Sequence, residues 1–184
     1  MLTNDEENPF KEVLYLLLEK VRATKAAFYL AEPNGAFGLV TQYGFSRSDR
    51  LADRVQRTDA LAQQIYERRE PTYVNDIKSA GRLLPIMEAG SSTRILTAPL
   101  YLNSRIVGIL DVRDKAGRVP FAPDDVAIVQ EVLRRLALKT HALPRFAQAA
   151  VEVPLEEEQT FVGANRARGS PLRMEVAPAA VLVA

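Results

Sequence analysis

The sequence lacks cysteine altogether and contains a single histidine, His141. Without cysteine, the chain can form no disulfide framework, no thiolate metal site and no cysteine nucleophile. One histidine excludes clusters of histidine ligands and argues against a Ser-His-Asp triad. We therefore predict that the protein holds no metal and no cofactor.

The sequence also lacks an excess of charge of one sign and any long hydrophobic run. It has 24 Lys and Arg residues against 23 Asp and Glu residues, a net charge of +1, which argues against polyanion binding. Its N-terminus is acidic where a secretory signal is basic, and its apolar runs are far shorter than the roughly 20 residues of a membrane span. These features predict a cytoplasmic protein that binds neither nucleic acid nor membranes.

A run of arginines between residues 47 and 69 does not change this prediction. Acidic residues are interleaved with the arginines throughout the run, which is typical of a solvent-exposed face with ion pairs. The arginines are Arg47, Arg50, Arg54, Arg57, Arg68 and Arg69.

What the sequence does contain is the composition of an ordinary globular domain. Of its 184 residues, 47% are hydrophobic and 26% are charged, and a chain of this length can bury a substantial core. Composition shifts divide it into an N-terminal extension (1–8), one domain (9–143) and a C-terminal tail or linker (144–184). The tail is acidic, then basic, then small and apolar, so we expect a terminus without a further domain or a segment that docks a protein partner.

The periodicity of the domain predicts helices at both ends and strands between them. Apolar residues at helical spacing predict a helix over 9–23 and another from Pro123 to about His141. Short aromatic and aliphatic runs predict strands at 26–32, 36–43, 69–76, 94–102 and 105–114, with a hairpin at Asn34-Gly35. Two short helical stretches are expected from near Ser48 and Thr58, and a broken helix within 77–93. Because Pro99 cannot donate to a sheet ladder, we expect it at a bulge or facing an edge.

Three stretches in this order resemble the GAF domain family of small-molecule sensor modules. EPTYVND (70–76) is similar to a short strand of the family that ends in aspartate. AGSSTRILTAPLYLNSRIVGILDVRD (89–114) resembles its loop and central hairpin, and VPFAPDDVAIVQEVLRRLA (119–137) resembles the start of its final helix. The resemblance covers about residues 9–143.

The resemblance implies an α+β fold and a regulatory function. The fold would be an antiparallel sheet of five or six strands, with the terminal helices on one face and small helices and loops enclosing a ligand pocket over the other. The cyclic-nucleotide signature of some members, Asn-Lys-Phe-Asp-Glu, is not recognisable, and the sulfoxide reductase and bilin-attaching members need cysteines that this chain lacks. Haem would need an axial ligand, and His141 is expected far from the pocket.

Seven residues are candidates for ligand binding. The resemblance would put Tyr43, Phe45, Tyr73 and Asp76 near the mouth of the pocket, where aromatic walls suit a planar organic ligand. Ser92, with its neighbouring hydroxyls, offers donors to an anionic ligand, and Arg94 and Thr97 follow it on opposite faces of the next strand. The alternatives are an ordinary core rim for the aromatic residues and a solvated, self-capping loop for the rest.

The final helix also predicts a homodimer. Apolar residues repeat at spacings of three and four, as in a short coiled-coil seam, and the first helix is apolar on more than one side. The alternative is that both stripes of each helix cover one sheet within a monomer. The predicted interface residues are Leu14, Leu17, Val126, Val129, Leu133 and Leu136, while Val132 and Leu138 are expected to face the sheet.

We therefore predict a non-enzymatic sensory domain that binds a small ligand and signals through helices at a dimer interface. One alternative is a ligand-free module that only dimerises, which a pocket filled by Leu83, Leu84, Ile86 and Met87 would favour. A second is an enzyme of unrecognised type, which the absence of any visible pair of nucleophile and base disfavours.

Overall fold

The computed structural model describes residues 9–140. Four α-helices occur in this range: α1 (Pro9–Val21), α2 (Ala60–Arg68), α3 (Leu84–Ala89) and α4 (Pro123–Thr140). The strands are β1 (Ala23–Ala31), β2 (Phe37–Tyr43), β3 (Arg54–Val55), β4 (Thr72–Val74), β5 (Ile95–Leu102) and β6 (Arg105–Lys115). Three short 3-10 turns complete the list: η1 (Ile77–Ser79), η2 (Gly81–Leu83) and η3 (Ala116–Arg118). The predicted tail, the N-terminal extension and His141 lie outside the described residues.

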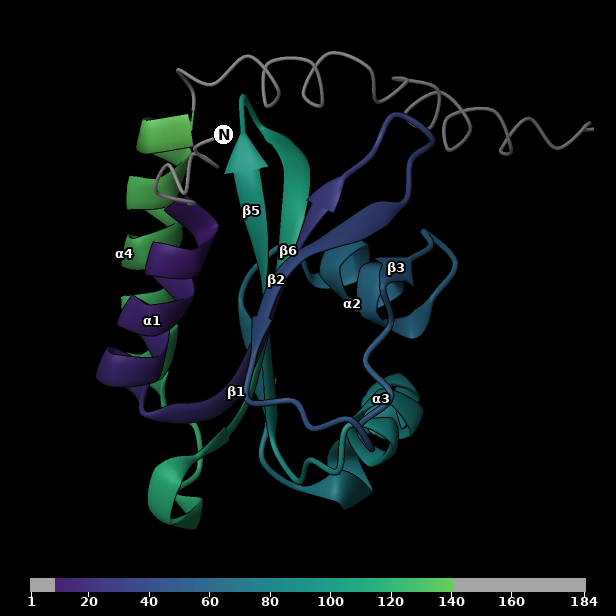
Figure 1. Ribbon diagram of the computed structural model, residues 1–184, viewed down its shortest axis with the longest axis vertical. Helices are drawn as coiled ribbons and strands as arrows, with labels where there is room; N and C mark the ends of the chain where they lie inside the picture. Colours follow the sequence, from purple (N-terminus) through teal and green to yellow (C-terminus); the bar gives the residue numbers. More distant parts are fainter. Residues whose placement is uncertain (1–8, 141–184) are drawn as a thin grey trace, which may run out of the picture. The chain divides into compact units, whose positions relative to one another are not determined.

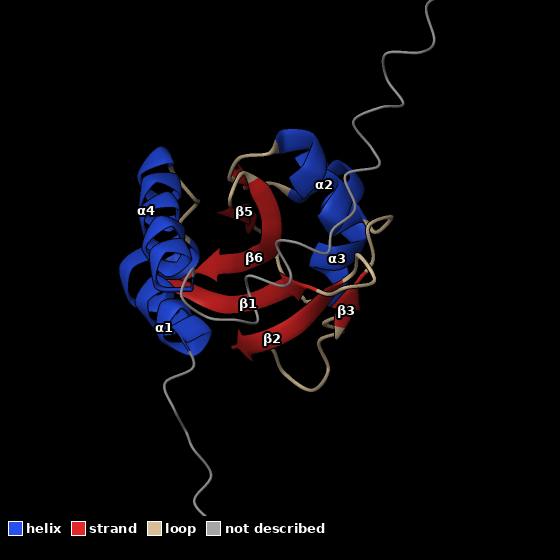
Figure 2. Cartoon of the chain, turned by 90° about the horizontal axis from the view of Figure 1, so that it is seen from above, coloured by secondary structure: helices blue, strands red, loops and turns tan. Residues whose placement is uncertain are grey.

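The strands form one six-stranded antiparallel sheet in the order β3-β2-β1-β6-β5-β4. Helices α1 and α4 pack side by side on one face, and α2 and α3 lie over the other (Figures 1 and 2). The expected α+β architecture is therefore confirmed.

Alternation along the central strands divides the core between the two faces. On β1, Phe28 packs into the cluster beneath α1 and α4, whereas Tyr29 packs into the cluster beneath α2 and α3. On β6, Leu110 and Ile109 divide in the same way. Because β1, β5 and β6 are covered on both faces, their central positions are apolar on both faces and do not alternate with polar residues.

The predicted hairpin between β1 and β2 is confirmed, with Pro33, Asn34 and Gly35 as its loop. The backbone N–H of Gly35 donates to the carbonyl of Glu32 at 2.9 Å, and the Asn34 side chain accepts from the N–H of Ala36 at 2.9 Å. Only Gly35 in this loop has a positive φ, of 82°. The connection is therefore a three-residue loop closed by glycine.

The helix expected from Ser48 does not form. Arg54 and Val55 instead pair with β2 as strand β3, and the carbonyl of Asp53 accepts from Leu39 at 2.8 Å. Leu51 and Val55 lie four residues apart, a spacing that suggests one face of a helix. Both contact the core beneath α2 and α3, but the chain that carries them is not helical. A spacing of four residues is too short a signal to separate these two conformations.

Pro99 lies within β5, where both expected features are present. Strand β4 pairs only with Ile95, Leu96 and Thr97, so pairing along that edge stops before the proline is reached. A shift of register between β5 and β6 follows directly, between Leu100 and Tyr101. The missing N–H of Pro99 is therefore tolerated in an otherwise central strand.

The apolar stripes of the terminal helices are used inside the protomer, which corrects their predicted assignment. Five of the six predicted interface residues are at most 5% exposed in the core between the helices and the sheet: Leu14, Leu17, Val129, Leu133 and Leu136. Val126 packs partly against the same core. Leu138, expected to face the sheet, is 67% exposed. The helices therefore bury the predicted seam against the sheet and against each other.

Candidate functional site

A cavity of about 310 Å³ lies between the sheet and the elements that cover its second face. Its lining comes from strands β1 and β6, from the segment between β2 and α2, and from the two covering helices, α2 and α3. The lining residues are Tyr29, Arg50, Leu51, Ala52, Val55, Asp59, Ala60, Leu61, Pro85, Ile86, Ala89 and Arg113. Most of this wall is apolar, and only four of these side chains carry a polar group, which is typical of a small-molecule site.

Tyr29 is the most deeply placed polar residue of the cavity. It is 1% exposed, and its hydroxyl makes no hydrogen bond to any residue in the described range 9–140. Burial, together with the nearby Asp111 carboxylate, raises the pKa of Tyr29. The phenol therefore stays protonated at neutral pH and keeps a hydrogen-bond donor in the cavity.

A buried ion pair lies beside Tyr29 on the same face of the sheet. The Arg113 guanidinium donates from Nε to Asp111 Oδ1 at 2.9 Å and from Nη2 to Asp111 Oδ2 at 2.7 Å. The two side chains are 2% and 0% exposed. Burial acts to lower the pKa of Arg113, but the adjacent Asp111 carboxylate outweighs it and raises the pKa. The Arg113 guanidinium therefore stays charged, with Asp111 as its partner.

Arg113 also anchors the end of α3 to the sheet. Its Nη1 donates to the carbonyl of Ile86 at 2.8 Å, and Lys25 Nζ donates to the carbonyl of Gly90 at 2.6 Å. The Ile86 carbonyl also accepts from the backbone N–H of Gly90 at 3.1 Å, so Arg113 adds a second, cationic donor at the negative end of the helix. A Cβ at Gly90 would overlap Arg113 Nη1, so the absence of a side chain lets the guanidinium approach.

Three consecutive charged residues at the end of β6 each hold a different segment. Arg113 reaches α3, Asp114 accepts from the backbone N–H groups of Thr93 and Arg94 at 3.0 and 2.9 Å, and Lys115 pairs with Asp125 at 2.7 Å. Asp125 lies in the first turn of α4 and also accepts from the N–H of Ala122 at 2.8 Å. Strand β6 therefore connects the cavity wall to the start of α4.

Of the seven predicted ligand residues, Phe45 lies nearest to this cavity. Its ring is flanked by Arg113, with the guanidinium carbon 5.1 Å from the ring centre, and by Lys25 Nζ at 5.6 Å. Lys25 also pairs with Asp49 at 3.0 Å. The backbone N–H of Ser46 and the Lys25 ammonium lower the pKa of Asp49 to about 2. The loop after β2 is thus tied to α3 and to the ion pair.

Three other predicted residues lie elsewhere on the sheet. Tyr43 packs edge-on against Tyr15 of α1, with ring centres 6.0 Å apart, so it lies on the face covered by the terminal helices. Tyr73, at 36% exposure, lines an open groove beside β4. Asp76 caps η1 by accepting from the N–H of Lys78 at 3.0 Å.

The remaining three are held by hydrogen bonds within the protein. Ser92 is buried and donates to the carbonyl of Gly90 at 3.0 Å. The Thr97 hydroxyl lies 3.3 Å from that of Thr72 across the β4–β5 pair. The backbone of Arg94 is bound to Asp114. None of the seven predicted residues belongs to the cavity lining.

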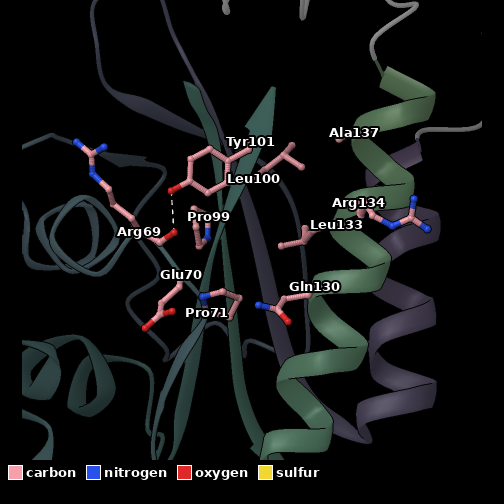
Figure 3. A pocket seen from close by; sticks show the side chains of 10 residues that line it. All are labelled: Arg69, Glu70, Pro71, Pro99, Leu100, Tyr101, Gln130, Leu133, Arg134 and Ala137. Carbon is pink, nitrogen blue, oxygen red and sulfur yellow. Dashed lines mark hydrogen bonds between the residues drawn. The ribbon is translucent and has the colours of Figure 1, made fainter. Parts of the chain in front are cut away.

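A second hollow, also of about 310 Å³, lies at the edge of the sheet between β5 and α4 (Figure 3). Pro71, Pro99, Leu100 and Leu133 contribute apolar surface to it. The Tyr101 hydroxyl donates to the carbonyl of Arg69 at 2.7 Å, as the dashed line in Figure 3 shows. This bond attaches the segment before β4 to the free edge of β5.

A groove of about 430 Å³ runs between α1 and α4 on their outer side. Val13, Leu16, Val132 and Leu136 give it an apolar surface. Glu12 and Glu19 of α1 and Arg135 and Lys139 of α4 also line it, so one helix contributes acidic groups and the other basic groups.

No helix within 9–140 is both long and apolar enough to span a membrane. In the same range, no three His, Asp or Glu side chains come together in a group that could hold a metal ion.

The chain belongs to the GAF domain family, because the family profile matches residues 5–139. GAF domains are typically sensory and regulatory modules, so this domain is of the sensory and regulatory class. The resemblance inferred from three sequence motifs is thereby confirmed. No curated protein matches the sequence.

Solved structures of the same fold include both regulatory proteins and an enzyme. A GAF domain/HD domain protein from Geobacter sulfurreducens has 16% identity and a TM-score of 0.63, covering 78% of this chain and 99% of that one. The GAF domain of a phosphoenolpyruvate-protein phosphotransferase from Coxiella burnetii has 19% identity and a TM-score of 0.61, covering 78% and 89%. A type II free methionine-R-sulfoxide reductase from Thermoplasma acidophilum has 20% identity and a TM-score of 0.56, covering 71% and 88%. Some GAF folds are therefore enzymes.

Sequence reasoning missed Tyr29, Asp111 and Arg113, although β6 contained a signal for two of them. Asp111 and Arg113 follow the uncharged run 106–110 of β6 and are separated by one residue, so they share a face of the sheet. Two opposite charges on a covered face require each other as partners. Tyr29 had no such signal, because a tyrosine in an apolar strand is usual in any core.

Proposed function

We propose that this domain is a non-catalytic sensor that binds a small molecule in the cavity beneath α2 and α3 and transmits the event through α4 to a second copy of the chain. The observation that carries the proposal is Tyr29, which lines the cavity from β1 and whose hydroxyl makes no hydrogen bond within residues 9–140. The buried side-chain polar atoms without a hydrogen bond in this range are Glu32 Oε2 and Arg94 Nε, so the Tyr29 hydroxyl opens onto the cavity, where it can donate to a bound ligand.

Occupancy of the cavity can be tested with a substitution that fills it. Ala60 is partly buried in the first turn of α2 and lines the cavity, whereas Gln63 is exposed on the same helix. Ala60→Phe should abolish the thermal stabilisation produced by ligands found in a screen of nucleotides, amino acids and aromatic metabolites, and Gln63→Phe should leave it unchanged. If no compound in the screen stabilises the wild-type protein, or if Ala60→Phe retains the response, ligand binding in this cavity is refuted.

Strand β6 supplies a route from the cavity to the terminal helices. A ligand that displaces α3 would act on Arg113, which bonds the Ile86 carbonyl, while Lys115 on the same strand holds Asp125 of α4. A ligand shifts such an equilibrium only by its difference in affinity for the two arrangements. In the ligand-free alternative, residues such as Leu83 and Met87 would fill the pocket. Both are buried, but neither lines the cavity, so they do not close it.

The groove on the outer side of α1 and α4 is the surface through which we expect two copies of the chain to dimerise. In a two-fold dimer the same surface of both copies meets, so the acidic α1 side of one copy would contact the basic α4 side of the other. The apolar groove would be covered at the same time. This interface uses Leu16 and Arg135. Of the seam that the sequence predicted, it reaches only Leu136, which lines the groove, since the rest of that seam packs within the protomer away from the groove.

Leu16→Glu should convert the dimer to a folded monomer. Leu16 is partly buried in the groove, so association would have to remove a carboxylate there from water and would lose the apolar contact of the leucine. Leu138→Glu is the control, because Leu138 is exposed on α4 and does not line the groove. Light scattering at high micromolar protein should give a dimer for the wild type and the control, with circular dichroism unchanged throughout. A monomeric wild type, or a dimeric Leu16→Glu protein, would contradict the interface.

A further inference from the structure

We infer that the ligand of this cavity is an uncharged molecule with a largely apolar body and one hydrogen-bond acceptor, such as a ketone or amide oxygen, that binds the Tyr29 hydroxyl. The inference rests on the proposed function and adds the chemical class of the ligand. It follows from three properties of the cavity: its donor, its charge balance and its walls.

The donor is the Tyr29 hydroxyl. It lines the cavity from β1, and no group in the described part of the chain accepts its proton. Because burial raises the pKa of this phenol, it offers a proton to an acceptor across the physiological range of pH. A ligand without an acceptor would leave this hydroxyl unsatisfied and dry.

The charge balance opposes an ionised ligand. Arg113 also lines the cavity, but its guanidinium is already held by the Asp111 carboxylate through Nε and Nη2 and by the Ile86 carbonyl through Nη1. The other charged side chains of the lining are Arg50 and Asp59, which are exposed and opposite in sign. A ligand charge placed beside the Asp111–Arg113 pair, away from exposed Arg50 and Asp59, would have no counter-charge at that depth, and burying one there is costly.

A cationic ligand meets a further obstacle. Phe45 packs partly against the same core and would be the nearby aromatic face for a cation, but Lys25 and Arg113 already occupy positions near its ring, at 5.6 and 5.1 Å. Both cations are in turn paired, with Asp49 and Asp111.

The walls favour an apolar body. Leu51 and Val55 line the cavity from the segment before α2, Leu61 lines it from α2, and Pro85 and Ile86 line it from α3. Contact with these side chains would contribute roughly 25 cal/mol for each Å² of apolar surface removed from water. A volume of about 310 Å³ leaves room for a fused two-ring molecule.

Four naphthalene probes of similar size test the class. They are 2-acetonaphthone, which is neutral and has an acceptor; 2-ethylnaphthalene, which is neutral and has none; 2-naphthoate; and 2-naphthylmethylamine, protonated at neutral pH. Calorimetric titration of the full chain should give the tightest binding for 2-acetonaphthone. The affinities of the other three probes should be lower by about tenfold or more. Tyr29→Phe should weaken only 2-acetonaphthone, by about tenfold, the loss of one hydrogen bond. Tyr101→Phe, which removes a hydroxyl at the other hollow, should change nothing.

The possible results separate this inference from the proposed function. If 2-naphthoate or the amine binds as tightly as the ketone, or if Tyr29→Phe leaves ketone binding unchanged, the ligand class is wrong while the cavity still binds ligands. If none of the probes binds but the compound screen yields a ligand that Ala60→Phe blocks, the class is again wrong and the proposed function stands. If neither the probes nor the screen gives binding, both fail.

Discussion

Asp111→Ala should destabilise the protein by roughly 3–5 kcal/mol, because it leaves the Arg113 guanidinium buried without its counter-charge. Arg113 is 2% exposed, and Asp111 accepts from it through both carboxylate oxygens. This is a large part of the roughly 5–15 kcal/mol by which domains are usually stable. Urea unfolding followed by circular dichroism measures the change.

The double variant Asp111→Leu with Arg113→Met is the matched control. It removes both charges and fills the space with apolar side chains, so its free energy of unfolding should lie well above that of Asp111→Ala and close to that of the wild type. The ion pair would then matter for the cavity and for anchoring α3 at Ile86, and not for net stability. A loss below about 1 kcal/mol in the single variant would show that the guanidinium reaches water and is not buried.

Leu136→Ala should cost roughly 2–5 kcal/mol, because it removes a side chain that is 1% exposed in the core beneath α1 and α4. Leu138→Ala, two residues further along the same helix, removes a side chain that is 67% exposed and should change stability by less than about 0.5 kcal/mol. Thermal or urea unfolding measures both changes. Because both variants replace leucine by alanine on α4, they differ only in the burial of the side chain.

The Leu136 comparison also decides between the two uses of this helix. If Leu136→Ala left the free energy of unfolding unchanged but weakened a dimer, the predicted seam would be an interface between copies after all. A loss of stability that does not depend on protein concentration places the residue in the core of the protomer.

The strongly periodic elements were predictable, and the irregular ones were not. Phe10, Val13, Leu17 and Val21 repeat over three turns, long enough for the spacing to identify α1 and its buried face. Residues 48–55 offered only Leu51 and Val55, and pairing with β2 decided their conformation. Pairing of this kind depends on residues distant in sequence, which a local pattern does not report.

The sequence by itself determined the family, the α+β architecture and the absence of thiol chemistry, because these depend on local periodicity, on ordered motifs and on composition. Only the tertiary structure decided which apolar stripe meets the sheet and which polar groups meet at the cavity. Leu136 and Leu138 are chemically identical, and only the packing of α4 against α1 and the sheet distinguishes them. Likewise, Tyr29 and Arg113 are far apart in sequence, and adjacent pairing of β1 with β6 brings them to one face beneath α3.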